Sequence, residues 1–231
     1  MRSQSFLDDR NTGLAHSAVR DHGCFLVENA VSPEFCEQVI RLIDGYKTDK
    51  KTEVHYAGTE LRIWDAQDTG PDLGRFYETC HETVARISGK SVRPKTLLAI
   101  RNLAIDPGAR DLQTGRWHLD SFFSQYKIFL FLTDTTEQSG PFEFIPGTQS
   151  PWFKLRMLSQ GICFRPSNLV DRQRAYQKID DRYVERLTRK GRKPQPLLCK
   201  AGTVAIADTS LIHRARPCFG GSRYALTAYY A

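Results

Sequence analysis

The spacing of apolar residues divides the chain into a helix-rich first part and a strand-rich remainder. The apolar run 23–31 is typical of a short buried strand. Ser32-Pro33-Glu34 then marks a helix start, with Ser32 as N-cap and Pro33 in the first turn, where its missing N–H costs nothing. Apolar residues recur at helical spacing from Phe35 to Ile43, and a further helix is expected over about residues 73–87.

From residue 95 onward, short apolar strands alternate with turns that contain glycine or proline. The expected strands cover 96–105, 126–133, 142–145, 203–207 and 223–230. The strand at 126–133 is almost continuously apolar, which indicates burial on both of its faces. Helices followed by many short strands favour a mainly β fold with flanking helices, namely a jelly roll.

No repeat, low-complexity stretch or long linker divides the 231 residues, and all-β units often reach this length. We therefore expect one domain over residues 1–231, with a helical region at about 1–95 and a basic helical insertion at about 150–196. No apolar run approaches the ~20 residues that span a bilayer. The N-terminus also lacks the apolar centre of a signal peptide. These features predict a cytoplasmic protein without a membrane partner.

Charge and cysteine content narrow the classes of function. The six cysteines include no C-x-x-C pair, which argues against a zinc ribbon or a disulfide framework. The net charge is +7, and residues 151–200 carry 13 Lys/Arg against 4 Asp/Glu. Such a positive field attracts small anions as well as nucleic acid. The basic excess therefore leaves both kinds of partner open.

The first candidate chemistry is the H-x-D pair in Trp117-His118-Leu119-Asp120. Residues i and i+2 of an extended strand point to the same face, so His118 and Asp120 present an imidazole and a carboxylate together. By itself this pair is common. Trp117 and the nearby Phe122-Phe123 are expected to be core residues rather than a substrate platform.

A second histidine, His213, follows a strand that begins after a glycine, and Arg223 opens the last strand ten residues later. Two histidines and one carboxylate leave three positions of an iron ion open, as O₂ activation requires. Structural zinc would need four protein ligands. A guanidinium such as that of Arg223 forms a fork suited to the carboxylate of a bound dicarboxylic acid.

Together these motifs resemble the phytanoyl-CoA dioxygenase-like family of iron(II)/2-oxoglutarate oxygenases. The resemblance is carried by residues 117–120, the block from Leu132-Thr133-Asp134 through Gly140-Pro141 to Ile145-Pro146-Gly147-Thr148, and the stretch from Gly202 through His213 to Arg223. It extends to the opening strand and helix and is weakest over 45–95 and 150–196. It implies a double-stranded β-helix, which is a cupin-like jelly roll.

The resemblance also implies the cofactors and the site residues. His118, Asp120 and His213 would bind iron(II), and Arg223 would bind 2-oxoglutarate, which with O₂ yields succinate and CO₂. Related halogenases have a small residue in place of Asp120, so hydroxylation is the expected reaction, with another oxidation such as desaturation, epoxidation or cyclisation left open. Family members often have Ser or Gly just after the distal histidine, where this chain has Arg214 and Ala215. The polar partner of Arg223 is therefore open, and the candidates are Ser222, Thr133 and Arg101.

The substrate is expected to be a small molecule, such as an acyl thioester, an amino acid or a natural-product intermediate. The basic 151–200 segment favours an anionic or carrier-linked one. Two alternatives remain, namely an oxygenase that acts on a nucleic acid or protein side chain, and a non-catalytic jelly-roll binding protein. No aromatic-plus-basic module with a known spacing supports nucleic acid binding. Lys127, at a strand start, could form a salt bridge or act as a ligand, or it could simply point to solvent.

Overall fold

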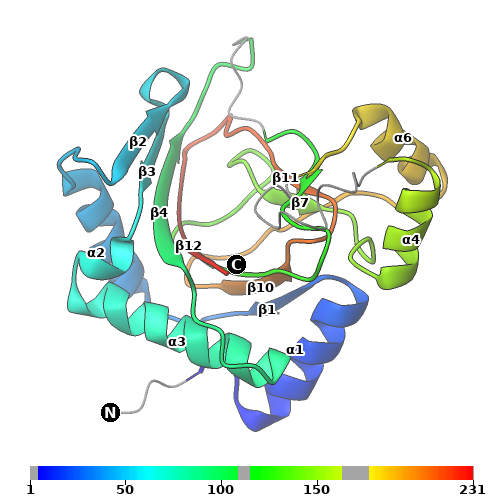
Figure 1. Cartoon of the computed structure of the whole chain (residues 1–231). Helices are drawn as coiled ribbons and strands as arrows, with labels where there is room; N and C mark the ends of the chain where they lie inside the picture. The colour runs from blue at the N-terminus through cyan, green and yellow to red at the C-terminus, as the bar shows by residue number, and fades with distance from the viewer. Residues whose placement is uncertain (1–4, 109–114, 163–176, 231) are drawn as a thin grey trace.

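The computed structural model describes residues 5–108, 115–162 and 177–230. Its strands form two antiparallel sheets that enclose a central cavity (Figure 1). The larger sheet has the order β1 (Cys24–Val27), β10 (Val204–Asp208), β6 (Tyr126–Phe131), β12 (Ser222–Tyr229), β4 (Thr96–Leu103), β3 (Glu60–Ile63) and β2 (Thr52–His55). The smaller sheet has the order β8 (Gln177–Lys178), β5 (His118–Leu119), β11 (His213–Ala215), β7 (Phe142–Phe144) and β9 (Gln195–Pro196).

Three helices cover the outer face of the larger sheet, and two lie beside the smaller one (Figure 1). The first group is α1 (Asp9–Asp21), α2 (Pro33–Gly45) and α3 (Pro71–Ser88), and the second is α4 (Pro151–Ser159) and α6 (Asp181–Arg189). Short 3₁₀ turns, η1 (Tyr56–Gly58) and η2 (Ala66–Asp68), flank β3. Apolar residues of α1, α2 and α3 pack with those of the larger sheet into the main core.

Local sequence explains where these helices begin. The Ser32 hydroxyl accepts a hydrogen bond from the backbone N–H of Phe35, and Pro33 occupies the first helical position of α2. In α1 the Asp8 carboxylate accepts from the N–H of Asn11 in the same way. Each cap satisfies a backbone donor that the first helical turn leaves without a partner. The strand-to-helix order of the opening segment thus follows from its sequence.

Side-chain alternation on β6 and β12 decides what faces the cavity. The two strands pair in register, with Tyr229 opposite Lys127 and Thr227 opposite Phe129. Alternate residues of each strand enter the main core, whereas those between them line the cavity. Arg223 lies on the cavity face of β12 by the same alternation. The expectation that 126–133 is buried on both faces is confirmed.

The predicted jelly roll is confirmed, and so are the strands expected from residue 95 onward and the helices at 33–45 and 71–88. Helix α1 and the β2–β3 hairpin were not predicted. Strand β2 has exposed and half-buried residues with no clean apolar alternation, which explains the omission of the hairpin. Part of the expected helical insertion at about 150–196 lies outside the described residues. Within the described ranges, no helix has the length and apolar character needed to cross a bilayer.

Gly140 shows why the turn between β6 and β7 needs glycine. Its φ is +71°, in the left-handed region that side chains disfavour. A Cβ at this position would lie 2.7 Å from the carbonyl oxygen of Arg216. This turn packs against the segment between β11 and β12, which carries the chain from His213 to Arg223.

Candidate metal centre

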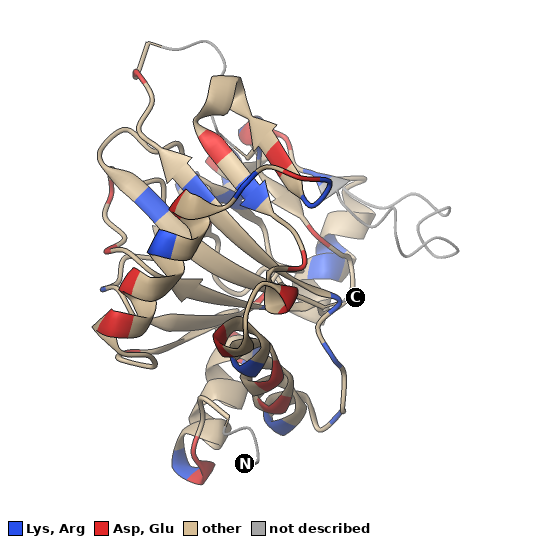
Figure 2. Cartoon of the chain, turned by 90° about the vertical axis from the view of Figure 1, so that its left-hand side faces the viewer, with Lys and Arg blue, Asp and Glu red and all other residues tan. Residues whose placement is uncertain are grey.

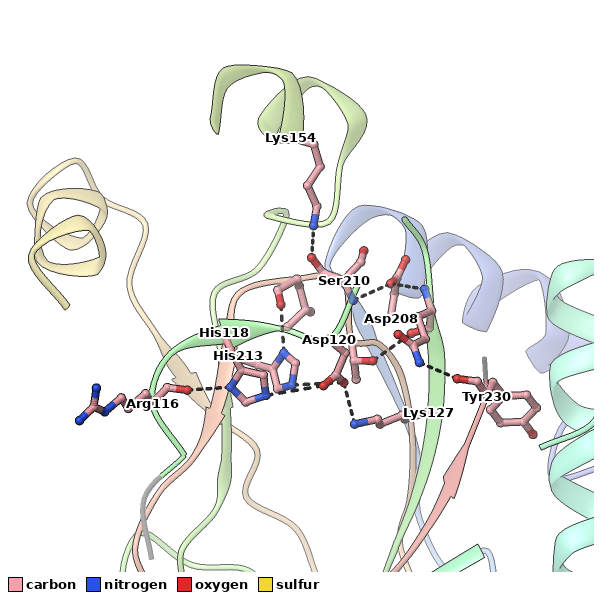
Figure 3. Close-up of polar contacts among 12 residues, drawn as sticks. Arg116, His118, Asp120, Lys127, Lys154, Asp208, Ser210, His213 and Tyr230 are labelled. Carbon is pink, nitrogen blue, oxygen red and sulfur yellow. Dashed lines mark hydrogen bonds and ion pairs between the residues drawn. The ribbon is translucent and has the colours of Figure 1, made fainter. Parts of the chain in front are cut away.

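Two neighbouring strands of the smaller sheet bring the three predicted metal ligands together. His118 on β5 and His213 on β11 are direct partners in the antiparallel pairing, although 95 residues separate them in the sequence. Asp120 follows β5, where its N–H donates to the carbonyl of Thr209 at 3.1 Å. One ligand atom of each of the three side chains lies within 4.8 Å of the other two. Figure 3 shows the carboxylate between the imidazoles and Lys127.

Backbone carbonyls fix the orientation and the tautomer of both histidines. Nδ1 of His118 lies 2.6 Å from the carbonyl oxygen of Arg116, and Nδ1 of His213 lies 3.0 Å from that of Leu211 (Figure 3). A carbonyl oxygen only accepts hydrogen bonds, so each Nδ1 carries the proton and each Nε2 presents a lone pair. Both Nε2 atoms lie 3.6 Å from an oxygen of Asp120. This outer-shell arrangement is the one that metal-binding histidines require.

Burial and charge in the site favour the protonation states in which the two histidines and Asp120 can bind a metal ion. Burial lowers the pKa of His118 and, more strongly, that of His213, so both rings are neutral at physiological pH. Burial alone would raise the pKa of Asp120, but the nearby Lys127 ammonium and the imidazoles outweigh this effect and hold the pKa below its usual range. Neutral imidazoles and an ionised carboxylate are the forms that bind a metal ion.

The acid sensitivity of the metal-free protein follows from His213. Burial lowers the pKa of this imidazole to about 3, whereas an unfolded histidine titrates near 6.5. Between these pH values the unfolded chain binds the extra proton, so stability should fall with falling pH by up to about 1.4 kcal/mol per pH unit. We expect the melting temperature of the metal-free protein to decrease between about pH 6.5 and pH 5, and His213→Asn to flatten this slope.

A matched control is His55, a half-exposed histidine that pairs with Glu53 on the β2–β3 hairpin. The His55→Asn variant should keep the wild-type slope of melting temperature against pH. A His213→Asn variant with the same slope as the wild type would contradict the assignment of the acid sensitivity to His213. Differential scanning calorimetry in the presence of a chelator provides the measurement.

The cavity beside the candidate metal ligands has a volume of about 540 Å³, and the buried Arg223 is among its lining residues. Nη2 of Arg223 donates to Oδ1 of Asn102 at 2.6 Å, and Nδ2 of Asn102 donates to Glu60 at 2.7 Å. Arg62 closes this chain by an ion pair with Glu60 at 2.8 Å. The Nε atom of Arg223 is buried without a hydrogen-bond partner. Such a donor is costly unless a ligand accepts from it.

The structure places the three candidate partners of Arg223 elsewhere. Arg101 lies on the outer face of β4, where it pairs with Asp44 at 3.0 Å. The Thr133 hydroxyl accepts from the backbone N–H of Tyr224. Ser222 lies next to Arg223 on β12, and alternation turns its side chain to the other face. Asn102 takes the partner position because the β12–β4 register sets it opposite Arg223.

Sequence reasoning left Lys127 either paired or pointing to solvent, and the structure shows the paired arrangement. The side chain of Lys127 is only 9% exposed, and its ammonium lies 2.6 Å from Oδ2 of Asp120. The expectation that it could point to solvent is therefore wrong. Its only signal in the sequence was a charge inside an apolar strand, which must be paired when it is buried.

The basic segment 151–200 supplies little of the described lining of the cavity. Lys178 is the one basic residue of this segment among the described residues that line the cavity. Arg189, in contrast, is exposed on α6 and pairs with Glu185. Arg192 stacks over Phe153 and donates to the carbonyl of Pro146. Residues 163–176 lie outside the described ranges. The run 186–193 is thus largely a solvent-facing surface of α6 and the turn after it.

Comparisons with solved structures agree with this fold. The epimerase SnoN in complex with Fe³⁺, α-ketoglutarate and nogalamycin RO aligns with a TM-score of 0.67 at 15% identity, over 96% of this chain and 84% of SnoN. EctD from S. alaskensis with 2-oxoglutarate and 5-hydroxyectoine aligns with a TM-score of 0.70 at 14% identity, over 98% and 76%. AviO1 from Streptomyces viridochromogenes Tue57 gives a TM-score of 0.63 at 17% identity, over 97% and 96%.

At these identities the structural likeness establishes the shared fold. The comparison with curated protein sequences gives no significant match. The family profile of phytanoyl-CoA dioxygenase (PhyH) matches residues 19–223, which include His118, Asp120, His213 and Arg223. Since that match spans most of the sequence, the chain belongs to the phytanoyl-CoA dioxygenase (PhyH) family.

Proposed function

We propose that this protein is an iron(II)- and 2-oxoglutarate-dependent dioxygenase that hydroxylates a small anionic organic molecule. The observation that carries the proposal is the convergence of two neutral imidazoles and one ionised carboxylate on one point of a cavity. Among the described residues, no fourth His, Cys, Asp or Glu joins this group. Two histidines and a carboxylate suit iron(II) with open positions better than structural zinc.

The rest of the cavity fits a bound 2-oxoglutarate. Arg223 lies in the same cavity as the metal ligands and keeps a buried Nε donor without a partner. Asn102 holds one guanidinium nitrogen and thereby limits the rotation of the side chain. A charge-assisted pair of hydrogen bonds to the distal carboxylate would satisfy the guanidinium. The fold neighbours SnoN and EctD were crystallised with this co-substrate.

The protein residues have separate tasks in the proposed reaction. Iron(II) bound with 2-oxoglutarate supplies O₂ activation and couples decarboxylation of the co-substrate, which gives succinate and CO₂, to oxidation of the substrate. His118, Asp120 and His213 would hold the metal at one side of the cavity and leave its other side open. Arg223 would fix the far end of the co-substrate, and the apolar side chains of Phe129, Phe131 and Phe142 would exclude water.

Hydroxylation is proposed because Asp120 fills the position at which related halogenases have a small residue. The fold itself permits other outcomes, since its neighbours include the epimerase SnoN and the carbocyclase SnoK. Incorporation of one ¹⁸O atom from labelled O₂ into the product would support hydroxylation. A product that carries no label, formed with stoichiometric succinate, would instead indicate desaturation, cyclisation or epimerisation.

The charge of the cavity supports an anionic substrate. Two carboxylates lie at the cavity, Glu60 in its described lining and Asp120 beside Lys127. The described lining also includes five cationic side chains: Arg62, Arg116, Lys127, Lys178 and Arg223. Iron(II) and the 2-oxoglutarate dianion cancel each other's charge, so loading the site leaves this positive excess in place. Arg116 and Lys178 are exposed at the cavity and are the natural contacts for a carboxylate or phosphate.

Charge reversal of these two residues tests the substrate class. Arg116→Glu combined with Lys178→Glu should raise the KM for an anionic substrate by about 10-fold or more, because each exposed charge contributes about 1 kcal/mol. The KM for 2-oxoglutarate should change little. Arg189→Glu combined with Lys190→Glu, on the exposed surface of α6, is the matched control. An unchanged substrate KM in the cavity variant would contradict an anionic substrate.

The charges on the side of the molecule that Figure 2 shows do not favour a nucleic acid substrate. In the view of Figure 2, basic and acidic residues are interleaved over the helices and strands on this side of the molecule. Several of the basic residues are paired, as in Arg93 with Glu78 at 2.6 Å and Arg86 with Asp9 at 2.9 Å. Such pairs leave less positive charge for phosphate contacts than the net charge suggests.

The function is tested most directly by ligand-dependent stability. Under anaerobic conditions, Mn²⁺ and 2-oxoglutarate together should raise the melting temperature, because both bind only the native state. Candidate carboxylates and phosphates that raise it further would then be assayed for succinate formation with iron(II) and O₂. A protein without this shift and without succinate formation would be a non-catalytic jelly roll.

A further inference from the structure

A buried lysine lies directly beside the candidate metal ligands. Lys127 is on the cavity face of β6, where Phe129 and Phe131 occupy the next inward positions. Its ammonium lies 4.1 Å from the centre of the ring of Tyr229, its cross-strand partner. The same ammonium lies 2.6 Å from Oδ2 of Asp120 (Figure 3). A buried ammonium is costly unless it is paired. Its partner here is a carboxylate that the proposed function assigns to the metal.

The two oxygens of Asp120 have different surroundings. Oδ1 lies 3.6 Å from Nε2 of His118. Oδ2 lies 3.6 Å from Nε2 of His213 but is also in contact with the Lys127 ammonium. An oxygen held by an ammonium is a poorer metal ligand than one without such a partner. The asymmetry therefore favours binding of a metal ion through Oδ1.

We propose that Lys127 is a positioning residue that holds Oδ2 of Asp120, so that the carboxylate presents Oδ1 to the metal as a single-oxygen ligand. This inference rests on the proposed metal site. Its consequence is that the second oxygen does not take one of the coordination positions needed by the co-substrate. The Tyr229 ring and the β6 backbone fix the ammonium, and the ammonium in turn fixes the carboxylate.

An opposing effect makes the inference testable. The positive charge of Lys127 also repels a metal cation and competes with it for Asp120. Lys127→Met removes the donor and the charge, whereas Lys127→Gln removes the charge but keeps an N–H donor on a side chain one atom shorter. If orientation dominates, Lys127→Met should bind metal about 10- to 100-fold more weakly, as for other outer-shell partners of metal ligands. Lys127→Gln should stay within a few-fold of the wild type.

The measurement is an anaerobic titration of the full-length protein with Co²⁺ in the presence of 2-oxoglutarate, followed by visible absorption. The intensity of the Co²⁺ bands depends on coordination number, so binding of Asp120 through both oxygens in Lys127→Met should also change the spectrum at saturation. Lys200→Met is the matched control, because Lys200 forms a 2.7 Å ion pair with Asp134 but is exposed. It should leave both the dissociation constant and the spectrum unchanged.

Each outcome has a distinct meaning. Tighter or unchanged binding by Lys127→Met, with the wild-type spectrum, would overturn the positioning role. If that variant does not fold, Lys127→Leu, which also lacks a donor, replaces it: weaker binding with an altered spectrum would support the positioning role, and wild-type affinity with the wild-type spectrum would overturn it. Failure of the proposed metal site is separate: wild-type protein and Asp120→Ala would then show the same affinity for Co²⁺.

Discussion

Replacement of Asp120 or His118 with alanine is expected to abolish 2-oxoglutarate turnover, with succinate formation reduced at least about 100-fold. Each change removes one of the three ligand atoms that lie within 4.8 Å of one another. The remaining two ligands would hold a metal weakly, and the Asp120→Ala change would also leave the Lys127 ammonium buried without its carboxylate. Succinate release with iron(II) under air provides the measurement.

Two controls distinguish loss of the metal from loss of the fold. Asp134→Ala removes a carboxylate from the end of β6 that pairs with the exposed Lys200, outside the cavity. His55→Ala removes a histidine from the β2–β3 hairpin. Both should retain turnover, and the two inactive variants should keep the wild-type circular dichroism spectrum. Wild-type turnover in either His118→Ala or Asp120→Ala would refute the metal assignment.

The second large effect is expected at Arg223. Arg223→Leu should raise the KM for 2-oxoglutarate on the order of 100-fold, because a buried charge-assisted pair of hydrogen bonds to a carboxylate contributes about 3 kcal/mol. The KM for the oxidised substrate should change much less. Arg223→Lys should recover part of the affinity, since an ammonium keeps the charge but loses the planar fork. Steady-state kinetics with 2-oxoglutarate as the varied substrate provides the measurement.

Arg101 offers a closely matched control for this prediction. It is one residue before Asn102 on β4, the strand paired with Arg223, but its side chain points outward to Asp44. Arg101→Leu removes a guanidinium at the same level of the sheet, and it should leave the KM for 2-oxoglutarate unchanged. A raised KM in Arg101→Leu, or an unchanged KM in Arg223→Leu, would show that the co-substrate is bound elsewhere.

The predicted site rests on two kinds of sequence information. His118 and Asp120 follow from local geometry, because alternation in an extended strand turns both side chains to one face. The fold class follows from short apolar strands with Gly and Pro turns, as confirmed by the two antiparallel sheets. The link from these residues to His213 and Arg223 came from spacing and resemblance, since nothing local joins residues 95 positions apart.

Strand register supplied what the sequence alone could not. Antiparallel pairing sets His118 opposite His213 and Asn102 opposite Arg223, and one residue of slip would turn each side chain to the other face. For this reason Asn102 was missed, while Arg101, its neighbour in the sequence, was considered. Register depends on contacts among strands that are distant in the chain, and apolar periodicity within one strand does not specify it.

The sequence by itself determined the positions of the strands along the second half of the chain, the pairing of an imidazole with a carboxylate at 118–120, and the basic character of the chain. Only the tertiary structure decided which of the many charged side chains lie at the cavity. It turned Lys127 into the cavity, set Arg116 and Lys178 beside it, and left most of the run 186–193 at the surface. The physical reason is that the residue type alone sets the charge of a side chain, whereas its burial and its partners depend on the packing of both sheets.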